Sequence, residues 1–104
     1  MTLLFSPAAN EDLLEIAQFI ASDSADRALS FIDELETQCE ALSRSPGIGT
    51  RRFELGQGVL MLPHGRYLIF YRQVEASVRI ERVLHSARDI GRGDIAHADL
   101  HRSR

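Results

Sequence analysis

The chain has 104 residues, a formal net charge of −3 and 44% apolar residues, which fits one domain with its own hydrophobic core and leaves no room for a second. Its single cysteine excludes an internal disulfide and suits a reducing compartment, and a sequence pI near 5.7 argues against a protein that coats nucleic acid by charge alone. The opening residues show no basic segment followed by an apolar run, so we expect no signal peptide, no membrane span and a cytoplasmic location.

Charge is divided unevenly between the two halves of the chain. Residues 1–50 hold nine carboxylates and two arginines, a net of −7, whereas residues 51–104 hold ten arginines and six carboxylates, a net of +4. All twelve basic residues are arginine, whose planar guanidinium suits paired hydrogen bonds with carboxylates and phosphates. Genomic base composition explains the absence of lysine equally well. The uneven charge therefore predicts electrostatic fields of opposite sign around the two halves and does not identify a ligand.

The first half predicts a short strand and two helices. Residues 2–5 have strand character, and the Ser6-Pro7 pair predicts a helix start, since serine caps helices and proline suits the first turn. This helix has an apolar face of Leu13, Ile16, Ala17 and Ile20 and a solvent-facing polar side of Glu11, Asp12, Glu15 and Gln18. After a break at residues 22–24, a second helix is expected to run to Ser45, with a buried stripe of Ala28, Phe31, Ile32, Leu35, Cys39 and Leu42.

The second half changes from helical to strand periodicity. Strands are predicted at residues 51–55, 59–62, 66–72 and 78–84, and their short connections force antiparallel neighbours. We therefore predict a two-layer α+β domain over residues 1–90, of order β-α-α-β-β-β with one further strand. In it a helical hairpin covers one face of a twisted antiparallel sheet and leaves the other face open. Residues 91–104 are expected to form a polar tail that is partly helical or disordered.

The last predicted strand breaks simple alternation at Arg82. Val78, Ile80 and Leu84 point to one face, and Arg82 would share it. Either a bulge re-aims the strand, or Arg82 lies at the rim of the sheet and pairs with a helical carboxylate. We favour the ion pair over a ligand contact, because partly buried charges are usually paired.

Two stretches of the second half form a signature: residues 63–72, PHGRYLIFYR, and residues 82–90, RVLHSARDI. With the β-α-α order and the helical segment at residues 28–35, they resemble the ParE branch of the ParE/RelE superfamily over residues 2–90. These proteins are the toxins of type II toxin-antitoxin, or plasmid stabilisation, modules. The resemblance implies a RelE/ParE-like fold and a bacterial toxin neutralised by a ParD-like antitoxin, whose C-terminal segment folds onto it. Leu14 and Phe19, beside the buried stripe of the first helix, are the antitoxin contacts that we expect, although they would equally suit a role as mere neighbours of the core.

The target separates the two branches of this superfamily. ParE-type members trap DNA gyrase, whereas RelE-type members cut messenger RNA on the ribosome with lysines and a C-terminal tyrosine. This chain has no lysine and no tyrosine after Tyr71. We therefore expect a non-enzymatic gyrase inhibitor that blocks replication, with no cofactor, no metal and no sequence-specific DNA binding of its own. The expected gyrase contacts are Arg66, Tyr67, Arg72, His85 and Arg88.

Two alternatives stay open. Some nuclease branches use a glutamate, an arginine and a histidine, and Glu54, Arg66 and His85 are the candidates here, although a histidine such as His85 more often stabilises a turn than acts as a base. A toxin-like fold that has lost its target would survive as an antitoxin-binding protein alone. His97 and His101 have the i, i+4 spacing of a helical metal site, but the glutamate of an HExxH pattern is missing, so we assign no metal there.

Overall fold

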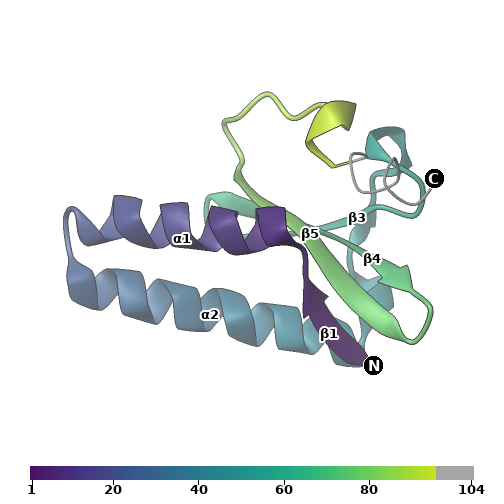
Figure 1. Ribbon diagram of the computed structural model, residues 1–104, viewed down its shortest axis with the longest axis horizontal. Coiled ribbons are helices and arrows are strands. Elements are labelled where there is room, and N and C mark those ends of the chain that lie inside the picture. Colours follow the sequence, from purple (N-terminus) through teal and green to yellow (C-terminus); the bar gives the residue numbers. More distant parts are fainter. Residues whose placement is uncertain (96–104) are drawn as a thin grey trace.

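A strand and a helical hairpin form the first half of the chain, as predicted (Figure 1). The computed structural model describes residues 1–95. The first elements are β1 (Thr2–Phe5), α1 (Pro7–Ala21) and α2 (Ala25–Arg44). Both helices begin at a serine cap: the Ser6 hydroxyl accepts the Ala9 amide at 2.9 Å, and the Ser24 hydroxyl accepts the Arg27 amide at 3.1 Å. The capping residues therefore start the two helices where the sequence places them.

A five-stranded sheet follows, in the order β1-β5-β4-β3-β2. Its later strands are β2 (Thr50–Arg51), β3 (Leu60–His64), β4 (Tyr67–Val74) and β5 (Ser77–His85). Strands β2 to β5 pair antiparallel with their neighbours, but β1 pairs parallel with β5. The sheet is thus mixed, which corrects the expected antiparallel sheet: β1 reaches β5 through the whole intervening chain, so no short connection sets its direction.

The two helices lie side by side on one face of the sheet, and the α1–α2 turn projects beyond it (Figure 1). The described chain is accordingly elongated, at 41 × 28 × 23 Å. Within residues 1–95 no helix combines the length and the apolar character that crossing a bilayer requires.

The main hydrophobic core lies between the helices and the sheet. Its buried members are Ala9, Ile16, Phe31, Leu35, Cys39, Leu42, Ile69, Tyr71, Val78, Ile80 and Val83. Cys39, predicted to be core, is 1% exposed, and burial, helped by the charges of Glu36 and Glu40, raises the pKa of its thiol to about 12. The thiol is therefore protonated and shielded at neutral pH, and its role is packing.

An extra residue in β5 changes which side chains face the helices. The register against β4 shifts by one position and leaves Glu81 as the additional residue of a β-bulge. Beyond it Val83 joins Ile80 in the main core, and Leu84 turns to the opposite face. The bulge that the sequence offered as an alternative at Arg82 is therefore present, one residue earlier.

The opposite face of the sheet, expected to be open, is covered by a second and smaller core. Its buried members are Leu55, Val59, Phe70, Leu84 and Ile95, with Met61, Leu68 and Ile90 packed against them. Two 3-10 turns that contact each other, Phe53–Leu55 and Arg92–Asp94, cover this face at the upper right of Figure 1. A central strand such as β4 has apolar side chains on both faces, so both faces require cover.

Two boundaries differ from the expected ones as a result. Residues 51–55 do not form one strand: only Thr50–Arg51 pairs with β3, and the 3-10 turn after it directs Leu55 into the second core. The folded unit also passes the expected boundary at residue 90, because Ile95 is only 2% exposed. The rest of the predicted tail, residues 96–104 with His97 and His101, lies outside the described residues.

Candidate functional site

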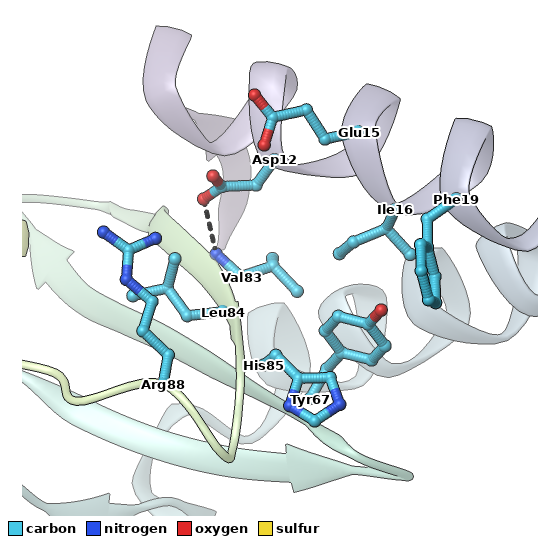
Figure 2. A pocket seen from close by; sticks show the side chains of 9 residues that line it. All are labelled: Asp12, Glu15, Ile16, Phe19, Tyr67, Val83, Leu84, His85 and Arg88. Carbon is cyan, nitrogen blue, oxygen red and sulfur yellow. Dashed lines mark hydrogen bonds between the residues drawn. The ribbon is translucent and has the colours of Figure 1, made fainter.

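A pocket of about 200 Å³ opens where α1 passes the exit of β5 and the start of β4 (Figure 2). It is lined by Asp12, Glu15, Ile16 and Phe19 from α1, Tyr67 from β4, and Val83, Leu84, His85 and Arg88 from β5 and the loop after it. Three of the five predicted target contacts and one of the two predicted antitoxin contacts are among them. The pocket combines apolar walls with side chains of both charges, which suits contact with another macromolecule.

A row of aromatic rings lies beside the pocket and connects α2 to the exit of β5. The ring centroids of Phe31 and Tyr67 are 5.5 Å apart, and the Tyr67 ring contacts the His85 ring edge-on with 5.2 Å between centroids. His64, at the end of β3, is also 5.5 Å from Phe31. Tyr67 therefore has two roles, since it packs against the main core and lines the pocket.

His85 stabilises the turn that follows β5. Its Nδ1 accepts the Ala87 amide at 3.0 Å, so the neutral ring carries its proton on Nε2. The neighbouring Ser86 amide donates to the Arg66 carbonyl at 2.7 Å and joins this turn to the β3–β4 turn. The turn-stabilising role that the sequence favoured is thus present, and Nδ1 is occupied.

Arg66 and Arg88 are both exposed at this end of the sheet. Arg66 lies in the β3–β4 turn, and Arg88 lies in the loop after β5, with its side chain 47% exposed. Arg88 donates from Nη2 to Asp94 Oδ1 at 2.7 Å. The bond between Ser86 and Arg66 holds the two loops together. We refer to Arg66, Tyr67, His85 and Arg88 as the pocket end of the sheet.

Asp12 was expected on the solvent side of α1, and the structure buries it. Its carboxylate accepts from Arg82 Nε at 2.8 Å, from Arg82 Nη2 at 2.9 Å and from the Val83 amide at 2.9 Å. This is the predicted pair of Arg82 with a helical carboxylate, and the bonds to Asp12 raise the pKa of the Arg82 guanidinium. Asp12 also protects the edge of β5 beyond Ile80, where β1 has ended. Its position one helical turn before the core residue Ile16 is a signal in the sequence that could have found this partner, but the prediction placed Asp12 in solvent.

Arg72, predicted as a target contact, is buried and paired inside the protein. Its side chain is 8% exposed, and its Nε lies 3.0 Å from Glu81 Oε2. Its Nη1 donates to the Gln57 carbonyl at 2.9 Å, because the β2–β3 connection folds over this part of β4. Arg72 is therefore a structural residue, which corrects its assignment to the contact surface.

In the nuclease alternative, Glu54 lies apart from Arg66 and His85, which are at the same end of the sheet. Glu54 is 62% exposed and bonded to Arg52 Nε at 2.6 Å, which holds the pKa of its carboxyl below the usual range. The Arg52 amide donates to the carbonyl of Val59, the residue before β3, whereas Arg66 follows the end of β3. That strand separates the two positions by roughly 16 Å at the usual rise per residue.

Leu14 and Phe19, the predicted antitoxin contacts, are both exposed, at 59% and 72%. They are five residues apart on α1, a rotation of about 140°, so they leave opposite flanks of the buried stripe. Phe19 lines the pocket, and Leu14 is absent from its lining. A partner segment that touches both side chains has to cross α1.

Three residues in or next to the pocket were predicted to have other roles. Ile16 was predicted as core, Glu15 as a solvent-exposed residue, and Asp94 as part of a tail; the first two line the pocket, and Asp94 binds Arg88. Helix, strand and tail meet here only through the fold, so no local pattern joins them. Within residues 1–95 no three His, Cys, Asp or Glu side chains are grouped so as to hold a metal ion.

Comparisons with known proteins identify the family. The family model described as the ParE toxin of the type II toxin-antitoxin system, parDE, matches residues 3–90. Among solved structures, a chain of the chromosomal ParDE TA system from P. aeruginosa is similar with a TM-score of 0.69 and 20% identity, over 82% of this chain and 95% of that chain. No curated protein sequence matches. Because the family model spans most of the chain, this protein belongs to the ParE toxin family of type II parDE toxin-antitoxin systems.

Proposed function

We propose that this ParE-family toxin binds DNA gyrase in the cytoplasm and blocks replication without breaking a bond itself. The observation that carries the proposal is the pocket end, where exposed Arg66 and Arg88 lie on loops joined by a backbone bond and flank the rings of Tyr67 and His85. Arginine and tyrosine around a small pocket supply much of the binding energy in protein interfaces. Arg72 is not part of this contact set, because it is buried.

The geometry favours binding over RNA cleavage. Cleavage needs a base for the 2′-hydroxyl and an acid for the leaving oxygen within reach of one phosphate. Glu54 lies at the other end of β3, and Nδ1 of His85 is engaged by Ala87. Arg66 and His85 alone support binding of a partner better than they support this chemistry.

A ParD-like antitoxin is the second proposed partner. Phe19 is highly exposed and lines the same pocket as His85 and Arg88. An antitoxin segment seated against Phe19 would cover this pocket and compete with gyrase for it. Contact with Leu14 as well would require the segment to wrap around α1, which suits a chain that folds on binding.

A gyrase assay with purified components tests the proposal. With supercoiled plasmid and gyrase, the wild-type toxin is expected to produce linear DNA after protein denaturation, and Arg66→Ala with Arg88→Ala is expected to lower its yield at least tenfold. The matched control, Arg44→Ala with Arg51→Ala, removes the same charge from exposed arginines away from the pocket and is expected to behave as wild type. Circular dichroism and urea unfolding confirm that each variant is folded.

Three outcomes would contradict the proposal in different ways. Unchanged plasmid linearisation by the folded Arg66 and Arg88 double variant removes the assigned surface. Defined cuts in messenger RNA in a translating extract, without linear plasmid, establish the ribosome-dependent nuclease instead. Harmless expression together with antitoxin binding identifies a toxin-like protein that has lost its target.

A further inference from the structure

Asp94, a residue without an assigned role, is bonded through all four of its polar atoms. Its Oδ1 accepts from Arg88 Nη2 at 2.7 Å, and its Oδ2 accepts the Gly91 amide at 2.9 Å. Its own amide donates to the Gly91 carbonyl at 3.1 Å, and its carbonyl accepts from Arg82 Nη1 at 3.1 Å. Asp94 is therefore held in one place and one orientation.

The surroundings of Asp94 are fixed on two sides. Arg82 is gripped by both carboxylate oxygens of Asp12, so the bond from Arg82 ties Asp94 to α1. The next residue, Ile95, is buried in the second core. Only 20% of the Asp94 side chain is exposed, which leaves little of it for contact with a partner.

Arg88 is different, because its side chain is 47% exposed and lines the pocket. A guanidinium has five N–H donors, and the ion pair with Asp94 forms through Nη2. The remaining donors are thus left for a partner while one corner of the group is anchored. Ordering a flexible arginine in advance removes part of the entropy cost of binding.

We propose that Asp94 is a positioning residue, which holds Arg88 at the rim of the pocket in the orientation that binds the target and does not itself contact the target. The inference rests on the proposed function of the pocket end and deepens it: one residue of the loop binds and another orients it. The relay Asp12, Arg82, Asp94, Arg88 carries this orientation from α1 to the loop. Outer residues that orient a contact group in this way are a recognised requirement of precise sites.

Activity measurements on single and double variants test the coupling. Asp94→Ala is expected to lower both growth arrest and gyrase-dependent linearisation about as much as Arg88→Ala, and Asp94→Asn, which keeps the size and two polar atoms, is expected to lower them less. The double variant Arg88→Ala with Asp94→Ala is expected to lose no more activity than Arg88→Ala alone, because both changes remove the same interaction. Additive losses would show that Asp94 acts elsewhere, and a gain of activity in Asp94→Ala would show that Asp94 masks Arg88; either result overturns the inference.

A nuclear magnetic resonance measurement tests positioning without reference to any target. The Nε–H group of Arg88 is expected to be well ordered in the wild type, and to become as mobile in Asp94→Ala as that of exposed Arg44 in the same spectrum. Asp33→Ala, which removes an exposed carboxylate from α2, is the matched control and is expected to leave Arg88 ordered. Equal mobility of Arg88 in wild type and Asp94→Ala overturns the inference even if gyrase is trapped. A wild type that orders Arg88 but does not trap gyrase overturns the proposed function alone.

Discussion

Strand β4 and its entry carry two pairs of arginine and tyrosine, and the two pairs have opposite fates. At the entry Arg66 is exposed and Tyr67 is half-buried beside the pocket. Four residues further, Tyr71 is fully buried and Arg72 is closed in by Glu81 and the β2–β3 connection. The same residue types thus serve contact at one end and structure at the other, and the difference lies in what covers them.

The hydroxyl of the buried Tyr71 is engaged by two hydrogen bonds within the protein. The Tyr71 hydroxyl donates to the Pro46 carbonyl at 2.7 Å and accepts the Gly49 amide at 2.9 Å. Burial raises the pKa of this phenol, and the Gly49 amide opposes the shift in part. Tyr71 therefore fastens the loop after α2 onto the sheet, a function that requires its burial.

The largest expected effect on stability comes from Glu81, whose carboxylate pairs with the buried Arg72. Glu81 is buried, with Arg72 at 3.0 Å and Arg79 at 3.3 Å. Glu81→Gln removes one member of a buried ion pair and is expected to lower the free energy of unfolding by about 3–5 kcal/mol. Arg66→Ala at the open entry is expected to change it by less than about 0.5 kcal/mol. Urea unfolding measures the stability of both variants, and equal losses would contradict the difference in burial between Arg66 and Arg72.

The next effect concerns the close approach of Gly49 to Tyr71. A Cβ at Gly49 would lie 2.3 Å from the Tyr71 hydroxyl oxygen, so one of the two has to move. Gly49→Ala is expected to lower the free energy of unfolding by about 1–3 kcal/mol, as overpacking does. Gly47→Ala is the control in the same loop, because nothing lies within 4 Å of its added Cβ. If the two variants have the same urea midpoint, the loop is not pinned by Tyr71.

A smaller effect concerns the pH dependence of stability that the buried thiol of Cys39 causes in the main core. The pKa of Cys39 rises from 9.0 to about 12 in the folded protein, so above pH 9 the unfolded chain releases a thiol proton that the folded chain keeps. Stability is therefore expected to fall as pH rises from 9 toward 12, and to fall less in Cys39→Ala. Urea midpoints at pH 8 and pH 10.5 measure this difference. A native thiol that is alkylated rapidly at pH 8 would show that this core opens.

The smallest effect belongs to an exposed ion-pair group beside the pocket end. Glu34 accepts from Arg27 Nη1 at 3.0 Å and lies 3.3 Å from His64 Nε2, and these bonds, Arg27 first, lower the pKa of its carboxyl. The contribution is present above its ordinary value of 4.5 and is lost as pH falls through the lowered value. Between pH 6 and pH 3 the wild type is therefore expected to lose slightly more stability than Glu34→Gln, whereas Glu36→Gln should follow the wild type. If the loss of stability matched the one expected for Glu81→Gln, Glu34 would contribute as much as a buried ion-pair residue, which would contradict this prediction.

Local patterns were sufficient for much of this fold and for part of the site. The serine caps, both helix stripes and the hairpin strands all follow from spacing within a few turns or strands. The broken alternation at Arg82 also predicted that this residue pairs with a helical carboxylate, although it did not identify Asp12. Tyr67, His85 and Arg88 were also predicted as contacts, and they meet at one pocket. Strand ends and turns bring such residues together because antiparallel register is set by short connections.

The amino-acid sequence by itself determined the caps, the periodic faces and the supply of arginines, because each depends on neighbours along the chain. Only the tertiary structure decided that Arg72 is buried, that Asp12 leaves solvent to hold Arg82, and that Ile95 closes a second core. These outcomes depend on segments that are distant in sequence, such as the β2–β3 connection above Arg72 and the C-terminal turn above β4. Whether a polar side chain is available to a partner is a property of what covers it, and that cover is set by packing across the whole chain.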